Sequence, residues 1–409
     1  MLVGGSLEHA HIAVLEDGSL VEHYVTRKSQ RSLVGNIYQG KVQNVLPGME
    51  AAFVDIGQPR NAVLYVGELM ASEEFEGDTQ PRIEHVLRSG QSVLVQVTKD
   101  PMGTKGARLT TELSLAGRYL VVVPNGSGYG ISRRLPDPER VRLREIARKI
   151  RADGYGLIIR TAAAGAESDE LERDMQRLVR LWEEISKRKD RAKPPVEIYV
   201  EPDLVIRVVR DLFSKDFQKL IVAEDDVYDR IMKYCETVDP ELADLVELHD
   251  GPLSLFDTYG VSEQVRKALE RRVWMPSGGY IVVDRTEAFT VIDVNSGRYV
   301  GKTSLEDTVV KINLEAAEEI VRQLRLRDIG GIIVIDFIDM LLVQNREQVL
   351  RAFRDALGRD KTKTQVIGIS PLGLVEMTRK NVSEGLVEAL STPCPTCEGR
   401  GAIIEDIET

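Results

Sequence analysis

The feature that most constrains the fold is a pair of apolar, β-branched runs that both end on aspartate, with a helical pattern between them. The first run, 288–294, carries Asp293, and the second, 331–336, ends at Asp336. Residues 308–327 place apolar side chains at the spacing of one helix face: Val309, Ile312, Ala316, Ala317, Ile320 and Leu324. A strand, a helix and a strand in this order predict a right-handed βαβ unit with parallel strands.

If these two strands are neighbours, Asp293 and Asp336 lie side by side at the carboxyl edge of the sheet, where open α/β folds bind ligands. Adjacent carboxylates repel unless a cation or a shared proton lies between them. Oxygen ligands without a nearby histidine favour Mg²⁺ or Mn²⁺. Asn295 points the same way as Asp293 and could orient a substrate oxygen. The alternative is that each acid ends a buried strand or caps a helix, as Asp339 is expected to do.

Composition limits the class of protein. The chain has 409 residues, which predicts two to four domains, and its 43% hydrophobic content is enough for real cores. Its net charge of −11 is not typical of a nucleic-acid-binding protein, although local patches decide binding. Three cysteines fit a reducing compartment. Without a signal sequence or an apolar run of membrane-spanning length, we expect a cytoplasmic protein with no transmembrane segment.

The N-terminal part of the chain predicts a hairpin followed by a small barrel. Residues 2–33 alternate around the turn dipeptide Asp17-Gly18, and so short a hairpin should join a sheet built elsewhere in the chain. Five short strands then follow, which predicts a closed barrel of the OB type. These strands are expected at 36–45, 50–56, 62–66, 92–98 and 107–111.

The barrel could bind RNA through one ring and several cations. Phe53 offers a stacking surface, and the barrel cations are Arg60, Lys99, Lys105 and Arg108. Arg133 and Arg134, which follow the barrel in the chain, are also expected to contact RNA. The alternative is a barrel with ordinary surface charges.

Residues 119–203 predict a separate unit. The glycine-rich stretch 126–130 only superficially resembles a dinucleotide loop, because Pro124-Asn125 before it and residues 131–134 after it suggest a hairpin. A strand ending on Arg160 and Thr161 supplies a cation and a hydroxyl, which suits a phosphate. Mixed α/β structure follows from residue 204.

The C-terminal part carries half of a zinc knuckle at Cys394 and Cys397. Structural zinc requires four ligands, so we expect two chains to contribute one pair each and to form a homodimer. A redox dithiol is the alternative. The loop 297–303 resembles a phosphate-binding loop, but Ser296 stands where that motif requires glycine. An NTPase is therefore a minor alternative.

In this order, these pieces resemble the ribonuclease E/G family of bacterial endoribonucleases over essentially the whole chain. The matching segments are Glu50–Asp55, Ile292–Ser296, Arg322–Asp328, Val334–Met340 and Cys394–Gly401. The resemblance implies a multidomain α/β fold, α+β overall. The implied domains are a split ribonuclease-H-like domain (1–33 plus 204–268), an OB-fold RNA-binding barrel (34–118), a 5′-phosphate sensor domain (119–203), a deoxyribonuclease-I-like catalytic domain (269–388) and a zinc link (389–409).

The resemblance also implies the chemistry. Asp293 and Asp336 would hold catalytic Mg²⁺ with Asn295 near the scissile phosphate, and single-stranded AU-rich RNA would be cut to 5′-phosphate and 3′-hydroxyl ends. The 5′-phosphate pocket would comprise Gly117, Val121, Arg160, Thr161 and Lys363, and zinc shared by two chains would bind Cys394 and Cys397.

Two positions depart from the family pattern. Lys363 replaces an arginine of the phosphate pocket, which removes a bidentate contact, and Val63 replaces the second ring of the barrel. The chain stops at Thr409 without the small C-terminal domain expected from the family, which leaves a tetramer and degradosome partners open. A zinc-linked dimer is still expected. Roles in rRNA processing and mRNA decay follow from the family. The competing hypothesis is a non-catalytic RNA-binding protein.

Overall fold

The structure is a computed structural model that falls into two compact units. It describes residues 1–26, 32–69, 82–101, 105–286, 288–298, 304–360, 362–370, 372–380, 385–392, 394–397, 399 and 401–403. The first unit comprises Met1–Thr26, Leu220–Asp225 and Glu247–Thr409. The second unit comprises Arg27–Lys219 and Asp226–Val246.

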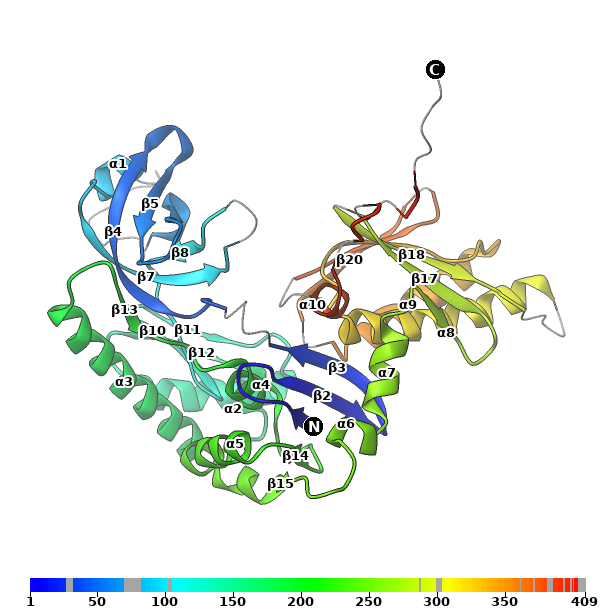
Figure 1. The fold of residues 1–409 in the computed structure, drawn as a ribbon, viewed down its shortest axis with the longest axis horizontal. Helices are drawn as coiled ribbons and strands as arrows, with labels where there is room; N and C mark the ends of the chain where they lie inside the picture. The colour runs from blue at the N-terminus through cyan, green and yellow to red at the C-terminus, as the bar shows by residue number, and fades with distance from the viewer. Residues whose placement is uncertain are drawn as a thin grey trace. The chain divides into compact units, whose positions relative to one another are not determined.

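The first unit is organised around a six-stranded sheet in the order β16-β17-β18-β19-β21-β20. Neighbouring strands are antiparallel except for β18 and β19, which are parallel. The strands are β16 (Arg272–Trp274), β17 (Tyr280–Arg285), β18 (Phe289–Asn295), β19 (Gly331–Asp336), β20 (Thr364–Ile369) and β21 (Val375–Arg379). Helices α8 (Leu305–Leu326) and α9 (Val343–Leu357) pack side by side against one face of this sheet (Figure 1).

Helix α8 confirms the helical pattern between the two aspartates. Ser304 caps it by accepting a hydrogen bond from the backbone N–H of Asp307. All six apolar positions of the predicted face are buried. Five of them pack in one core with Ile292 and Ile335 of the two strands: Ile312, Ala316, Ala317, Ile320 and Leu324. The helix begins three residues earlier than predicted, because the cap at Ser304 starts it.

A second sheet of the first unit has the order β15-β14-β1-β2-β3. The predicted N-terminal hairpin forms from β2 and β3, and β1 pairs in parallel with β14 more than 200 residues away, at Leu2 and Ile221. Arg325 of α8 donates to Glu16 and Glu22 and so fixes the hairpin to that helix. The elements are β1 (Leu2–Gly4), β2 (His11–Glu16), β3 (Ser19–Val25), β14 (Leu220–Val222), β15 (Val246–Leu248), α6 (Leu255–Thr258), α7 (Val261–Ala268) and α10 (Leu386–Leu390).

The second unit contains the predicted barrel. Its five strands close because β4 pairs with both β5 and β7, which confirms a closed, OB-like barrel. The elements are β4 (Ile37–Leu46), β5 (Ala51–Asp55), β6 (Ala62–Tyr65), α1 (Ile83–Val86), β7 (Ser92–Lys99) and β8 (Arg108–Thr110). Strand β13 (Val196–Tyr199) adds to β4 from outside the closed ring.

The rest of the second unit corrects one prediction. The stretch 126–130 does not connect a hairpin, because β11 pairs in parallel with β12 and not with β10. The sheet order is β11-β12-β10-β9. The elements are β9 (Leu115–Ala116), β10 (Leu120–Pro124), β11 (Tyr129–Ile131), α2 (Asp137–Ile150), β12 (Tyr155–Ile159), α3 (Ser168–Arg191), α4 (Leu204–Leu212) and α5 (Asp225–Val238).

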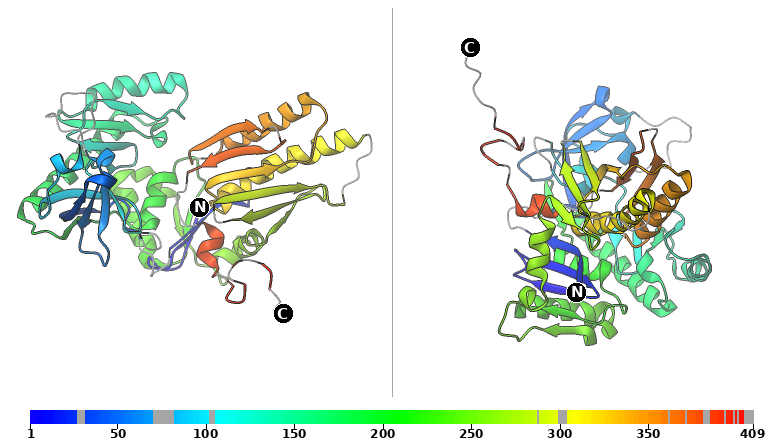
Figure 2. Two further views of the ribbon diagram at one scale, coloured as in Figure 1. Left: turned by 90° about the horizontal axis from the view of Figure 1, so that it is seen from above. Right: turned by 90° about the vertical axis from the view of Figure 1, so that its right-hand side faces the viewer.

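Both units are mixed α/β structures, as two further views show (Figure 2). Four short 3₁₀ helices complete the assigned elements of the described segments: Pro47–Met49, Val66–Glu68, Thr161–Ala163 and Pro240–Leu245. No helix in the described part of the chain combines the length and the apolarity needed to cross a bilayer. The division into five family domains stays a prediction.

Candidate functional site

Asp293 and Asp336 lie directly opposite each other on the parallel strands β18 and β19. Both side chains are exposed at the carboxyl ends of their strands, whereas Ile292 and Ile335, one residue earlier, point into the core. The alternation of a strand produces this arrangement, since successive side chains face opposite sides. The predicted juxtaposition of the two acids is confirmed.

The environment of Asp336 favours a bound cation. Partial burial raises the pKa of this carboxyl, and the charges of Asp293 and then Asp339 raise it further. Each of these effects disfavours the anion in the absence of a counter-charge. Carboxylate oxygens of this kind suit Mg²⁺ or Mn²⁺, so the donor set fits the expected metal. The described residues contain no group of three or more acidic, histidine or cysteine side chains placed to hold a metal, so a cation here would rely on the two aspartates and non-acidic ligands.

Asn295 is held beside the pair. Its Nδ2 donates a hydrogen bond of 2.8 Å to Asp293 Oδ2. This contact orients the amide, which keeps its second N–H and its Oδ1 for another group.

The segment that follows Asp336 is fixed by side chains that the sequence analysis missed. Asn313 of α8 is fully buried, where it donates to the carbonyl of Ile338 and accepts from the N–H of the same residue. Glu306 accepts hydrogen bonds from the backbone of Leu341 and Leu342. Asn313 is a polar residue next to the apolar stripe of the predicted helix. This position could have indicated a buried, hydrogen-bonded side chain.

The 5′-phosphate residues predicted from the second unit lie on neighbouring segments of that unit. Arg160, which follows β12, donates to the carbonyl of Gly117 at 2.6 Å and forms an ion pair of 2.7 Å with Asp211. Val121 on β10 is half-buried and pairs with Ile158 on β12. The structure therefore brings Gly117, Val121 and Arg160 together.

Thr161 and Gly117 are positioned by their own neighbours. The hydroxyl of Thr161 lies 2.7 Å from the hydroxyl of Ser132, which sequence reasoning missed. A β-carbon on Gly117 would lie 2.3 Å from Oδ2 of Asp174, so the position requires glycine. Asp174 is buried, and it accepts hydrogen bonds from the N–H groups of Tyr119 and Leu120.

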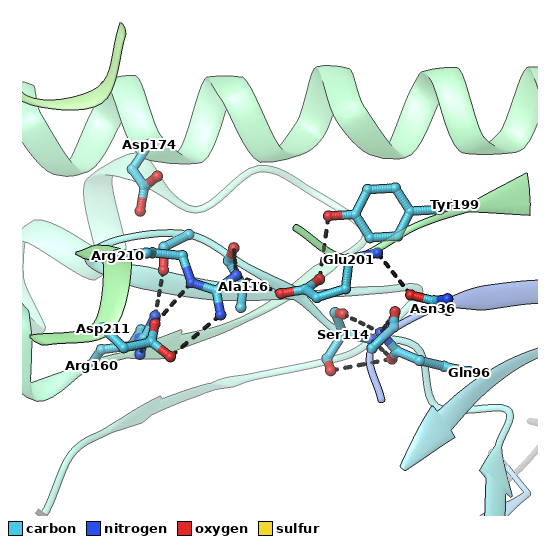
Figure 3. A network of polar contacts seen from close by, with 12 residues as sticks. Asn36, Gln96, Ser114, Ala116, Arg160, Asp174, Tyr199, Glu201, Arg210 and Asp211 are labelled. Atoms are coloured by element: carbon cyan, nitrogen blue, oxygen red, sulfur yellow. Dashed lines mark hydrogen bonds and ion pairs between the residues drawn. The ribbon is translucent and has the colours of Figure 1, made fainter. Parts of the chain in front are cut away.

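The buried Arg210 and the partly exposed Asp211 form a network of ion pairs with Arg160 (Figure 3). Arg210 pairs with Asp211 at 2.8 Å and with Glu201 at 2.6 Å. Burial would raise the pKa of Asp211, but its hydrogen bond to Arg210 and the charges of Arg210 and Arg160 leave it lowered. Asp211 therefore stays anionic and holds the guanidinium of Arg160 in place. In the sequence, this network is indicated only by the two consecutive charged residues at 210–211 in an otherwise apolar helix.

The remaining phosphate residue, Lys363, belongs to the first unit. It is exposed just before β20, and its carbonyl accepts from the backbone N–H of Lys380. Arg133 and Arg134 in the second unit are exposed as well. Their roles stay predictions.

The outer face of the barrel carries one more ring than expected. Phe53 is half-buried and pairs with Val63 in the register of β5 and β6. Tyr65, two residues further along β6, points to the same side and is 38% exposed, with the guanidinium of Arg108 5.1 Å from its ring centre. Lys99 and Lys105 are exposed.

The C-terminal cysteines are accessible, and the third cysteine is not. Cys394 is exposed, Cys397 is half-buried, and Cys235 is buried in α5. The backbone N–H of Cys397 lowers the pKa of the Cys394 thiol, which favours the thiolate that zinc requires. Two thiolates supply half of a tetrahedral site. Residues 299–303 of the phosphate-loop-like segment lie outside the described residues.

An α/β sheet with two carboxylates on adjacent strands, together with an OB-like barrel, defines a class of multidomain proteins with a candidate metal site. The model of the ribonuclease E/G family matches residues 114–382. Ribonuclease G of Escherichia coli (strain K12) is 42% identical over 416 residues, covering 100% of this chain and 85% of that protein. Ribonuclease G of Haemophilus influenzae is 40% identical over 100% of the chain and 84% of the relative. Ribonuclease E of E. coli (strain K12) is 38% identical over 97% of the chain and 38% of the relative. The chain belongs to the ribonuclease E/G family.

Proposed function

We propose that this protein is a Mg²⁺-dependent endoribonuclease that hydrolyses single-stranded, AU-rich RNA to 5′-phosphate and 3′-hydroxyl ends. Family membership supports the endoribonuclease activity in RNA processing. The observation that carries the metal dependence is the register pairing of Asp293 with Asp336. Two carboxylates this close at a sheet edge repel each other, and the pKa of Asp336 is raised. A bound divalent cation would neutralise this repulsion.

Each residue at this edge of the sheet would have a separate role. Asp293 and Asp336 would hold Mg²⁺, which when bound would supply Lewis-acid stabilisation of charge on the phosphodiester. Asn295 is oriented by its hydrogen bond to Asp293, and its remaining N–H is available to a phosphate oxygen. Asn313 of α8 keeps the segment after Asp336 in place through two hydrogen bonds with the backbone of Ile338.

The pocket around Arg160 would bind the 5′-monophosphate of the substrate and stimulate cleavage. Arg160 and Thr161 offer a guanidinium and a hydroxyl, and Gly117 and Val121 lie on the adjoining segments of the same unit. A phosphate dianion would compete with Asp211 for the same guanidinium.

Single-stranded RNA would contact the barrel through Phe53 and the cations Lys99 and Lys105, with Arg133 and Arg134 adding positive charge. Zinc bound by Cys394 and Cys397 of two chains would link a homodimer, from which a tetramer could assemble. In the cytoplasm, the enzyme would take part in rRNA processing and mRNA decay.

The test compares a short AU-rich RNA carrying a 5′-monophosphate with the same RNA carrying a 5′-hydroxyl, in the presence of Mg²⁺. Internal cleavage by the wild type and its loss in Asp293→Asn, with RNA binding retained, are the expected results. Cleavage that survives Asp293→Asn would contradict the metal site. Binding without cleavage by the folded wild-type protein would favour a non-catalytic RNA-binding protein.

A further inference from the structure

An aromatic and cationic cluster lies on the edge of the six-stranded sheet, on strands β16 and β17. The ring centres of Trp274 and Tyr280 are 5.0 Å apart, with their planes inclined by 56°. The guanidinium of Arg272 lies 4.7 Å from the centre of Tyr280 and 5.9 Å from that of Trp274. These separations are within the range of favourable ring–ring and cation–ring contacts. The three side chains therefore form one connected surface.

The strand register places this surface on the same face as the candidate metal site. Tyr280 pairs with Asn295, and Trp274 pairs with Tyr280. Partners directly opposite each other on neighbouring strands point to the same side of a sheet. The ring of Trp274 therefore belongs to the face that carries Asn295 and, two residues away along β18, Asp293.

A second set of register pairs connects Arg272 with the candidate metal site. Arg272 pairs with Val282, and Val282 pairs with Asp293. Adjacent strands are about 4.8 Å apart, so two strand spacings put the backbone of Arg272 roughly 10 Å from that of Asp293. Nucleotides in a stacked strand advance about 3.4 Å each, so this distance corresponds to about three nucleotides or fewer.

The cluster borders an open cavity of ≈ 450 Å³. Its lining residues are Glu270, Arg271, Arg272, Trp274 and Val282. Helices α8 and α9 pack on the opposite face of the sheet and leave this one uncovered by the described part of the unit. Trp274 is 56% exposed. A tryptophan that served only to stabilise the fold would bury most of its ring, because burial is the source of its stabilisation.

The charges around the cavity favour an anionic strand. Arg271 is neutralised by a bidentate ion pair with Asp284. Arg272 has no ion pair with a carboxylate among the described residues, and its guanidinium faces the two rings. An unneutralised arginine beside exposed rings suits a nucleic acid, whose phosphates are anionic and whose bases stack.

We propose that Trp274, supported by Tyr280 and Arg272, is a stacking subsite for one base of the RNA strand whose phosphate lies at Asp293 and Asp336. The inference rests on the proposed function and adds a contact that positions the strand within about three nucleotides of the scissile bond. Stacking on Trp274 tolerates any base, because every base has a π-face. Arg272 contributes a cation for a neighbouring phosphate.

Fluorescence tests the contact without relying on catalysis. The chain has two tryptophans, Trp182 and Trp274, so Trp182→Phe leaves Trp274 as the only indole. In this background, with Asp293→Asn to keep the RNA intact, single-stranded AU-rich RNA should quench the emission in a saturable way. Replacing the nucleotides near the scissile position one at a time by an abasic residue should abolish the quenching at one position. RNA that binds without quenching at any position would overturn the proposal.

Kinetics with the otherwise wild-type enzyme give a second test. The substrate is 5′-hydroxyl RNA, which does not engage the phosphate pocket. With it, Trp274→Ala should raise KM about 10-fold and leave kcat nearly unchanged, because stacking stabilises the bound substrate and the transition state equally. Trp274→Phe should retain most of the affinity. Tyr259→Ala is the matched control, because Tyr259 is 42% exposed in the same unit but on another element.

The two tests separate this inference from the proposed function. Cleavage by the wild type with an unchanged KM in Trp274→Ala would overturn the subsite and leave the function intact. Quenching of Trp274 in the Asp293→Asn protein, together with a folded wild-type protein that cleaves no RNA, would support the subsite and refute the function. A change in molecular mass with unchanged RNA affinity in Trp274→Ala would assign the surface to a second copy of the chain and overturn the proposal.

Discussion

Asp293 and Asp336 are register partners on two parallel strands, with their carboxyl groups on the same exposed face of the sheet. The βαβ connection through α8 makes them neighbours although 43 positions separate them in the chain. Their mutual repulsion, added to partial burial, raises the pKa of Asp336. The site therefore carries an electrostatic cost that a divalent cation relieves.

Asp336→Asn should abolish metal-dependent cleavage and stabilise the metal-free protein. Loss of one carboxylate ligand removes several kcal/mol of transition-state stabilisation, so the cleavage rate should fall by about 100-fold or more. Removal of the repulsion should raise the free energy of unfolding without metal, while the extra stability that Mg²⁺ confers on the wild type disappears. Urea denaturation with and without Mg²⁺ measures both effects. Asp339→Asn is the comparison and should change cleavage less; an equal loss would make Asp339 a ligand.

Arg160→Gln should remove the preference for RNA with a 5′-monophosphate. A hydrogen bond to a charged group contributes about 1.5–3 kcal/mol, so the rate ratio between 5′-monophosphate and 5′-hydroxyl RNA should fall by about 10-fold or more towards unity. Cleavage of 5′-hydroxyl RNA should be unaffected. Arg148→Gln is the control, because Arg148 is exposed on α2, where it contacts Tyr129 and the exposed Glu145 rather than a residue of the predicted pocket. A ratio unchanged in Arg160→Gln would place the phosphate elsewhere.

Arg379→Met should strongly destabilise the first unit. Arg379 is buried and binds Asp360 at 2.8 Å and Asp328 at 2.7 Å, with side-chain exposures of 3% for Arg379 and 2% and 10% for the two acids. Removing the cation leaves two carboxylates without their partner, which costs about 3–5 kcal/mol. Urea unfolding measures the loss. Adding Asp360→Leu to Arg379→Met should restore part of the stability, and the surface change Arg148→Met should cost less than about 0.5 kcal/mol.

The stability of the first unit should depend on pH through His23. This ring is buried beside His11 and Phe256, and neither of its nitrogens has a hydrogen-bond partner among the described residues. Burial, followed by the charge of His11, lowers the pKa of His23 to about 4. The unfolded chain, with a pKa of about 6.5, binds more protons between these values, so stability is complete above pH 6.5 and falls as the pH drops towards 4.

The expected loss from this group between pH 7 and pH 5 is roughly 2 kcal/mol. His23→Leu should flatten the pH dependence of the unfolding free energy by that amount. His9→Gln, at an exposed position of the same unit, should leave the dependence unchanged. An equal slope in His23→Leu and wild type would show that other groups govern the response.

The three thiols should differ in reactivity. In metal-free protein at pH 7.5, Cys394 and Cys397 should react rapidly with a thiol reagent, since the N–H of Cys397 lowers the pKa of Cys394. Burial raises the pKa of Cys235 to about 11, so this thiol should react only after unfolding. Added Zn²⁺ should protect the first two and increase the dimer fraction, and a chelator should reverse both effects. Protection without dimerisation would contradict a shared site.

The sequence by itself determined the elements whose signals are local. The apolar spacing of α8, the β-branched runs of β18 and β19, and the short barrel strands all follow from periodicities of 3.6 and 2 residues, and the structure confirms them. Because strands joined by one helical crossover are commonly parallel neighbours, even the pairing of Asp293 with Asp336 was predictable.

Only the tertiary structure decided which distant segments pair. Strand β1 pairs with β14, and β11 pairs in parallel with β12 although Pro124-Asn125 and residues 131–134 suggested a hairpin. Likewise, nothing near Trp274 in the sequence indicates that β16 brings it onto the face of Asp293 through β17. Strand register depends on contacts between residues far apart in the chain. A pattern within a few residues fixes which way a side chain points, but not what lies opposite it.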